Sequence, residues 1–249
     1  MTKSVLKVSL IVGLMALGIQ SRAEAVVQMS VRICQGLICQ DFGPQPGPGT
    51  FTNDNIIVGD FSISGSVSTI ENPALSNAAT TTISVQRLTT TNGAQGNDLT
   101  IWLNAEGYNL PVGPNYTFTD TLSATSSGPT AGANVAFQGW FSDASIVGFP
   151  PAGSVSPGSI NCNLVTTPAD SCNGPNAAIG VTGAPPFGIT TRTTFTILNA
   201  SAINSYTSNA QANIVGVPVV PEPASMLLLG TGLLGLARFG RRRFNKTTP

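Results

Sequence analysis

Apolar and polar residues alternate one by one through much of this chain, which is the two-residue period of a β-strand with one buried face. The alternation is clear over residues 27–33 and again over 61–67, where serines separate the apolar positions. Further runs rich in Thr, Val and Ile lie at 80–88, 99–103, 116–122, 135–141, 190–198 and 210–217. The pattern predicts a mainly β domain, built as an antiparallel β-sandwich or as a jelly-roll-like fold.

Many short strands need many turns, and the composition supplies them. Glycine (27) and proline (18) are abundant, whereas charged residues make up only 9% of the chain. An average soluble domain has about 25% charged residues. Turn-forming residues at 91–93, 113–115 and 128–129 separate the expected strands. The proline-rich stretch 148–176 is expected to be a long loop, or a boundary between two small sheets.

The formal net charge of zero hides an uneven distribution of charge. Between residues 26 and 217 the basic residues are Arg32, Arg87 and Arg192, against nine acids, so this region carries a net charge of −6. A surface of this sign lacks the basic footprint that phosphate contacts require. Nucleic acid is therefore not an expected partner.

Residues 1–25 have the features of a secretory signal peptide. Lys3 and Lys7 precede an apolar run over 10–19, and the small residues Ala23 and Ala25 occupy the −3 and −1 positions of a cleavage site. Cleavage after Ala25 makes Val26 the mature N-terminus, and residues 26–217 are expected to form the β-rich extracytoplasmic domain. A buried helix or an uncleaved anchor is the alternative, although the run is shorter than the ~20 residues of a membrane-spanning helix.

The segment 218–249 has three parts in a fixed order. A Pro-Glu-Pro motif comes first, an apolar and glycine-containing segment follows at about 224–237, and a basic tail occupies 238–249. The motif residues are Pro221, Glu222 and Pro223, and the arginines of the tail are Arg238, Arg241, Arg242 and Arg243. The apolar segment predicts a single transmembrane helix, and the arginines predict a stop-transfer cluster because positive charges stay on the cytoplasmic side.

This order of parts resembles the C-terminal sorting signal of PEP-CTERM proteins, the exosortase substrates of Gram-negative bacteria. In that family a membrane transpeptidase, the exosortase, recognises the tail, cuts near the motif and transfers the protein to a surface or exopolysaccharide acceptor. The resemblance implies an exported protein of the cell envelope or extracellular matrix, held transiently in the inner membrane by its tail. It also implies an exosortase-like transpeptidase and extracellular polysaccharide as partners. A plain single-pass anchor is the alternative.

Four cysteines lie in the region 26–217, namely Cys34, Cys39, Cys162 and Cys172. An even number of cysteines in an oxidising compartment is first interpreted as disulfides. The local pairing, Cys34 with Cys39 and Cys162 with Cys172, closes the shortest loops. A zinc site built from all four thiolates is the alternative, but the spacings suit it poorly. No metal site is predicted.

The chain offers little for catalysis. It contains no histidine, and residues 26–217 contain no lysine, which removes Ser-His, Cys-His and Ser-Lys nucleophile pairs. The paired carboxylates of a glycosidase remain open, although the acids show no motif spacing. The sequence predicts neither an enzyme nor a bound cofactor.

Two further features have a functional and a structural interpretation. Asn53, Asp54 and Asn55 with Asp60 could supply oxygen ligands to calcium, or they could form a turn that satisfies its own backbone. The larger aromatic residues could form a sugar-stacking platform on one face of the sandwich, or they could fill its core. They are Trp102, Tyr108, Tyr116, Trp140 and Phe141. The leading hypothesis is a non-enzymatic structural protein, and the alternative is a carbohydrate-binding or adhesive module.

Overall fold

The computed structural model describes residues 27–46, 49–72, 78–90, 98–109, 111, 115–128, 132–142, 154–165, 169–174, 177–198, 205–217 and 231. The chain divides into two compact units, Met1–Gly216 and Val217–Pro249. The expected signal peptide, with Ala23 and Ala25, lies outside the described residues. So do the Pro-Glu-Pro motif, the arginine cluster and, apart from Thr231, the expected membrane segment.

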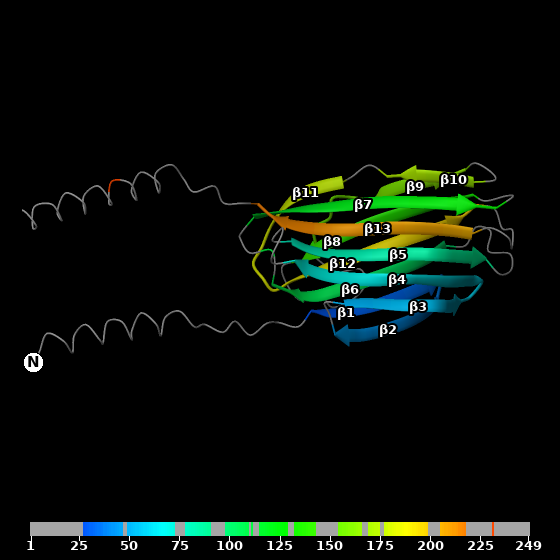
Figure 1. The fold of residues 1–249 in the computed structure, drawn as a ribbon, viewed down its shortest axis with the longest axis horizontal. Coiled ribbons are helices and arrows are strands. Elements are labelled where there is room, and N and C mark those ends of the chain that lie inside the picture. The colour runs from blue at the N-terminus through cyan, green and yellow to red at the C-terminus, as the bar shows by residue number, and fades with distance from the viewer. Residues whose placement is uncertain are drawn as a thin grey trace, which may run out of the picture. The chain divides into compact units, whose positions relative to one another are not determined.

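The described residues of the first unit form thirteen β-strands and no helix (Figure 1). In chain order they are β1 (Gln28–Gln35), β2 (Ile38–Pro46), β3 (Gly49–Val58), β4 (Phe61–Asn72), β5 (Ala78–Thr90), β6 (Asp98–Tyr108), β7 (Asn115–Ser127), β8 (Ala133–Ser142), β9 (Ile160–Leu164), β10 (Ala169–Asn173), β11 (Ala177–Thr182), β12 (Phe187–Ile197) and β13 (Ser205–Gly216). Each strand-like run of the sequence coincides with one of these strands, and where a run extends beyond its strand it does so by one residue.

The strands form two sheets that lie one in front of the other in Figure 1. Sheet A has the order β2-β1-β6-β12-β8-β9, and sheet B has the order β10-β7-β13-β5-β4-β3, with β11 also paired to β7. Every described pairing of strands is antiparallel. The antiparallel β-sandwich predicted from the alternation is therefore confirmed.

The core lies between the two sheets because alternate residues of almost every long strand point inward. One contiguous cluster of buried apolar side chains draws on both sheets. Aromatic rings fill one part of it, where Phe187 lies 5.6 Å from Tyr108, 5.9 Å from Tyr116 and 5.4 Å from Phe141, measured between ring centroids. Aromatic residues bury the largest apolar areas, so this cluster is a main contact between the sheets.

Five strands escaped the sequence prediction, namely β2, β3, β9, β10 and the six-residue β11. β2 and β3 lie at one edge of the sandwich, and most of their side chains are exposed, so they lack a plain apolar alternation. β9 and β10 have five residues each and lie within 148–176. The expectation of a long loop there was wrong over these two strands, because two short edge strands among prolines leave too little period to recognise.

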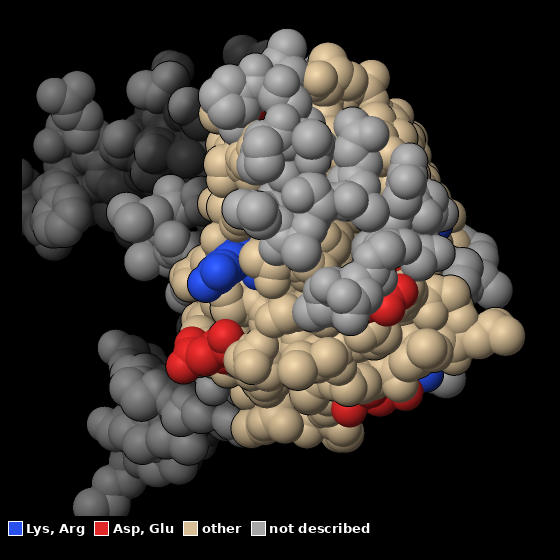
Figure 2. All heavy atoms as spheres, turned by 90° about the vertical axis from the view of Figure 1, so that its right-hand side faces the viewer, with Lys and Arg blue, Asp and Glu red and all other residues tan. Residues whose placement is uncertain are grey.

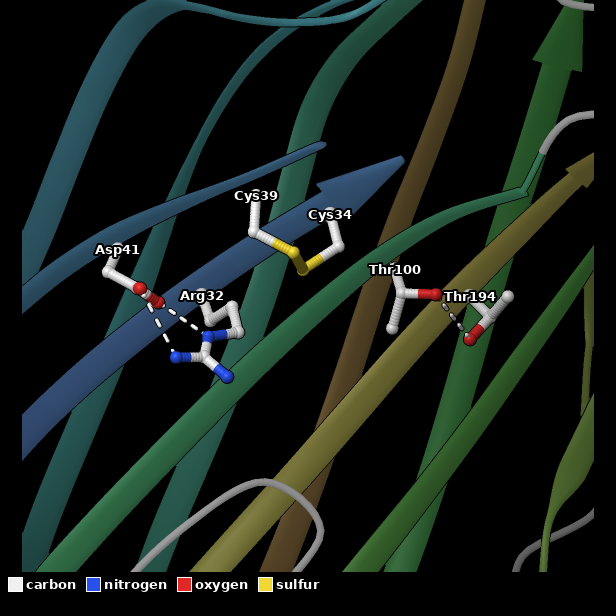
Figure 3. Close-up of a disulfide and its surroundings, with 6 residues drawn as sticks. All are labelled: Arg32, Cys34, Cys39, Asp41, Thr100 and Thr194. Atoms are coloured by element: carbon white, nitrogen blue, oxygen red, sulfur yellow. Dashed lines mark hydrogen bonds and ion pairs between the residues drawn. A yellow bond between two sulfur atoms is a disulfide. The ribbon is translucent and has the colours of Figure 1, made fainter. Parts of the chain in front are cut away.

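Two disulfides join the cysteines in the local pairs that the spacing favours. Cys34 and Cys39 are directly opposite each other and close the β1–β2 hairpin (Figure 3). Cys162 of β9 is bonded to Cys172 of β10, which links an edge of sheet A to an edge of sheet B. Because all four sulfur atoms are bonded in pairs, the structure gives the four-thiolate zinc site no support.

Leu103→Ala tests how much packing in the core contributes to the free energy of unfolding. Leu103 is 0% exposed at the centre of β6, so the truncation should leave a cavity and lower the free energy of unfolding by about 2 to 5 kcal/mol. The matched control is Leu37→Ala, because Leu37 is 102% exposed at the β1–β2 turn. Urea unfolding followed by circular dichroism gives both values. Equal losses for the two variants would contradict this packing.

Candidate functional site

The outer face of sheet A carries the one cluster of large aromatic and charged side chains that the described strands bring together from distant parts of the sequence. Arg192 on β12 is directly opposite Trp102 on β6 and, on its other side, Gln138 on β8. Trp140 follows Gln138 on the same face of β8, because side chains two residues apart share a face. Strand register alone therefore gathers these residues.

Arg192 lies against both indole rings. Its Cζ is 5.3 Å from the ring centroid of Trp102 and 5.2 Å from that of Trp140. The two indoles are 5.6 Å apart with an angle of 25° between their planes. Cations at these distances from an aromatic face are attracted by its quadrupole. The three side chains, each partly buried, form a unit that we call the Trp-Arg-Trp cluster.

Hydrogen bonds fix one end of the guanidinium. Arg192 Nη2 donates to Gln138 Oε1 at 3.1 Å, and Gln138 Nε2 donates in turn to Ser156 Oγ at 3.1 Å. Burial lowers the pKa of Arg192 from its ordinary value, but a guanidinium stays charged at neutral pH. The cluster thus holds a permanent positive charge beside two apolar rings.

Arg32 extends the same row of cross-strand neighbours, because it is directly opposite Trp102 and Asp41. Its Nε donates to Asp41 Oδ1 at 2.5 Å (Figure 3). This pairing raises the pKa of Arg32 and lowers the pKa of Asp41. Arg32 is therefore neutralised locally, whereas within the described part of the chain no carboxylate forms an ion pair with Arg192.

The five aromatic residues expected as one platform do not share a face. Tyr108, Tyr116 and Phe141 are at most 2% exposed and belong to the core, so for these three the expectation was wrong. Tyr108 turns inward because Gly107, with a φ of +86°, forms a bulge that breaks the alternation of β6. Trp102 and Trp140 alone face outward.

Sheet B presents a different outer face, made almost wholly of hydroxyl and amide side chains. One row across five strands consists of Thr121, Gln211, Thr82, Ser68 and Thr50. A hollow of about 380 Å³ opens on this sheet between β10, β7 and β13. Figure 2 looks onto one end of the sandwich, where uncharged residues likewise cover most of the described surface. Because residues 26–217 contain no lysine, the outer face of sheet B is hydrated mainly through hydroxyl and amide groups.

Asp120 is the one acid buried between the sheets among the described residues. Its Oδ2 accepts a hydrogen bond from the Gly139 backbone N–H at 2.7 Å, and its Oδ1 has no partner. Burial raises the pKa of Asp120 to about 7. Such a carboxyl could serve as a general acid, but it faces the packed core. A glycosidase would need two acids facing each other. The surface hollow beside Asp54 contains Arg87 and no second acid among its lining residues.

Three of the four residues considered for calcium are engaged in hydrogen bonds of their own. Asn53 Oδ1 accepts a hydrogen bond from the Asn55 backbone N–H at 3.1 Å, inside a register shift of β3. Asp60 exchanges two hydrogen bonds with the side chain of Gln35, at 2.9 and 2.7 Å. Over the described ranges, no group of three or more acids, cysteines or histidines could hold a metal ion. The local-turn interpretation is the one that these bonds fit.

Comparison with known families decides the nature of the C-terminal segment. Residues 219–243 match the model of the PEP-CTERM protein-sorting motif. The chain carries a PEP-CTERM sorting motif. The match spans the Pro-Glu-Pro motif, the apolar segment and the arginines, as the resemblance predicted. A PEP-CTERM motif marks an exported protein of the cell envelope that an exosortase processes.

Among the residues that the structure describes, no helix is long and apolar enough to cross a membrane.

Solved structures resemble this chain only remotely. The enzymatically active domain of tailspike protein 4 from bacteriophage CBA120 is 10% identical, with a TM-score of 0.24, over 61% of this chain and 19% of that one. The CBM22-1-GH10 modules of xylanase 10B from Clostridium thermocellum are 10% identical, with a TM-score of 0.24, over 70% of this chain and 27% of theirs. A PA14 sugar-binding domain from an RTX adhesin is 11% identical, with a TM-score of 0.24, over 76% of this chain and 89% of its own.

The chain spans less than a third of the tailspike and xylanase structures that it matches. Likenesses at these TM-scores carry no argument about function. No curated protein matches the chain.

Asp120→Asn tests the buried carboxyl. Since the pKa of Asp120 rises from 3.8 to about 7 on folding, the folded state holds this proton more tightly than the unfolded state. Its contribution to stability is therefore complete below about pH 4 and is lost as the pH rises to about 7, by a few kcal/mol. Relative to wild type, the Asn variant should gain stability across this window.

Urea unfolding from pH 4 to pH 8 measures the difference. The control is Asp98→Asn, which changes an exposed acid at the start of β6 and should follow wild type at every pH. A difference between Asp120→Asn and wild type that stays constant with pH would show that Asp120 ionises freely in the folded protein.

Proposed function

We propose that this PEP-CTERM protein is a non-catalytic structural component of the cell surface or extracellular matrix, associated with extracellular polysaccharide. The observation that carries the proposal is the order of its parts. The last strand of the sandwich ends at Gly216, and the sorting motif begins at residue 219. A folded domain followed directly by a sorting signal is the organisation expected of a protein that is displayed at the cell surface.

The tail explains how display would be achieved. Residues 1–25 direct export and are removed, residues 26–217 fold outside, and residues 218–249 hold the protein in the inner membrane. The prolines of the Pro221-Glu222-Pro223 motif keep the backbone extended, because proline fixes φ and donates no backbone hydrogen bond. An extended segment is accessible to an exosortase-like transpeptidase. The arginines, from Arg238 to Arg243, retain the end of the tail on the cytoplasmic side.

The surface of sheet B supports a structural role beside polysaccharide. Its rows of hydroxyl and amide groups carry few charges and can both donate and accept hydrogen bonds. A hydrated sugar polymer offers the same groups in return, so contact costs little desolvation of charge. The chemistry of the described residues supports a non-catalytic protein, because the one carboxyl with a pKa near neutrality, that of Asp120, lies in the core.

A carbohydrate-binding module is the second candidate, and the Trp-Arg-Trp cluster favours it. Trp102 and Trp140 are partly exposed on the outer face of sheet A. Indole rings offer an apolar surface that the C–H faces of a sugar ring can cover, with a polar edge left for hydrogen bonds. In this alternative the protein binds a glycan through sheet A, and the C-terminal tail directs the protein to the cell surface.

Terminal mapping of the native protein tests the proposal. Surface material from the protein's own host should begin at Val26 and end near residues 221–224, with any added mass reporting the acceptor. The double variant Pro221→Ala, Pro223→Ala restores backbone hydrogen bonding and freedom to the motif. We expect it to keep residues 224–249 and to stay in the membrane fraction, as shown by intact mass.

Pro218→Ala is the matched control, because this proline lies in the same linker but outside the motif. It should be processed like wild type. Surface protein that still ends at Pro249 would show a plain anchored domain and would remove the basis of the proposal.

A further inference from the structure

Arg192 is an unusual cation for this protein. Between residues 26 and 217 there are three basic side chains. Arg32 is paired with Asp41, and Arg87 is exposed on β5. Arg192 is partly buried, yet within the described ranges no carboxylate pairs with it. Removing a charge from water without an ionic partner costs free energy unless other groups compensate.

The two indoles and Gln138 compensate only part of this cost. A guanidinium has five N–H donors in a planar fork, and the described hydrogen bonds use only Nη2, which donates to Gln138. The remaining donors lie next to the rings of Trp102 and Trp140. A planar fork of this kind matches a carboxylate, which it binds through two parallel hydrogen bonds.

Two acids on this face are engaged with other partners, and a third, Asp98, is exposed at the start of β6, four residues from Trp102. Asp41 is bound by Arg32, and Glu106 Oε1 accepts a hydrogen bond from Asn104 Nδ2 at 2.8 Å. Asn104 Oδ1 in turn accepts from the Thr190 hydroxyl at 2.7 Å, and Thr190 is directly opposite Trp140. The face thus brings together the Arg192 guanidinium, which no described carboxylate pairs with, two indole rings and a network of polar side chains.

We propose that Trp102, Arg192 and Trp140 bind a carboxylated sugar unit of an acidic polysaccharide, so that this inference rests on the carbohydrate-binding candidate above. The indole rings take the apolar C–H face of the sugar, and the Arg192 guanidinium takes its carboxylate. The net charge of −6 on residues 26–217 does not prevent this, because charges farther than about 8 Å are screened at physiological salt. The contact with Arg192 is local.

Tryptophan fluorescence gives a direct readout, since Trp102 and Trp140 are the two tryptophans of the whole chain. The full chain, purified in mild detergent, is titrated with an oligomer of 1,4-linked hexuronic acid. The matched probe is the same oligomer after reduction of its carboxyl groups to alcohols, which keeps the ring and removes the charge. A poly-glutamate peptide of equal charge tests whether an anion alone suffices.

We expect the hexuronic acid oligomer to change the tryptophan emission and to bind roughly tenfold or more tightly than its reduced form, because charge-assisted hydrogen bonds are the stronger ones. Arg192→Gln should abolish this preference. Arg192→Lys should keep part of it, because the charge remains but the fork is lost. Arg87→Gln removes the same charge from sheet B and should bind like wild type, which controls for net charge.

Other results overturn the inference in distinguishable ways. If the wild type binds both oligomers equally and Trp140→Ala weakens that binding, the preference for a carboxylate is wrong but the protein still binds carbohydrate. No change in emission with either oligomer would remove the site and the carbohydrate-binding candidate together. Equal binding of poly-glutamate would show an anion site without a sugar. The wild-type titrations decide these points even if Arg192→Gln fails to fold.

Discussion

Contact between the apolar inner faces of two antiparallel sheets holds every other feature of the domain in place. Each long strand sends alternate side chains into this interface, and the rings around Phe187 connect residues from both sheets. Since the inner side chains are buried in the core, only the outer side chains are available to contact a ligand or partner. The disulfide between β9 and β10 adds a covalent link across the edges of the same two sheets. Function in this domain must therefore be sought on the outer faces.

The two outer faces divide the chemistry between them. Sheet B offers rows of uncharged hydroxyls and amides, whereas sheet A brings Trp102, Arg192 and Trp140 together and pairs Arg32 with Asp41. Strand register produces this difference, because β12 lies between β6 and β8 and sets Arg192 opposite Trp102. A shift of one residue would turn the cluster into the core. The packing of the inner faces thus fixes the site on the outer one.

The sequence predicted the long strands and the local cysteine pairs, because each depends on neighbours along the chain. It missed β2, β3 and β9 to β11, which are short or lie at edges where few side chains are buried. It grouped Tyr108 with the tryptophans, since nothing in the composition reveals that the bulge at Gly107 turns that ring inward. The Trp-Arg-Trp cluster and the buried Asp120 depend on which strands become neighbours, and alternation within one strand does not encode that pairing.

The sorting motif at residues 219–243 gives this domain a destination, and the central claim is that the tail delivers an independently folded sandwich to the cell surface. The most direct measurement is to remove residues 218–249 and to follow the shortened chain in its own host. The account predicts an exported protein with an intact sandwich, judged by its thermal unfolding midpoint, that is released into the medium. A shortened chain that remains at the surface in the wild-type amount would contradict it, because the sandwich would then need no tail to reach its place.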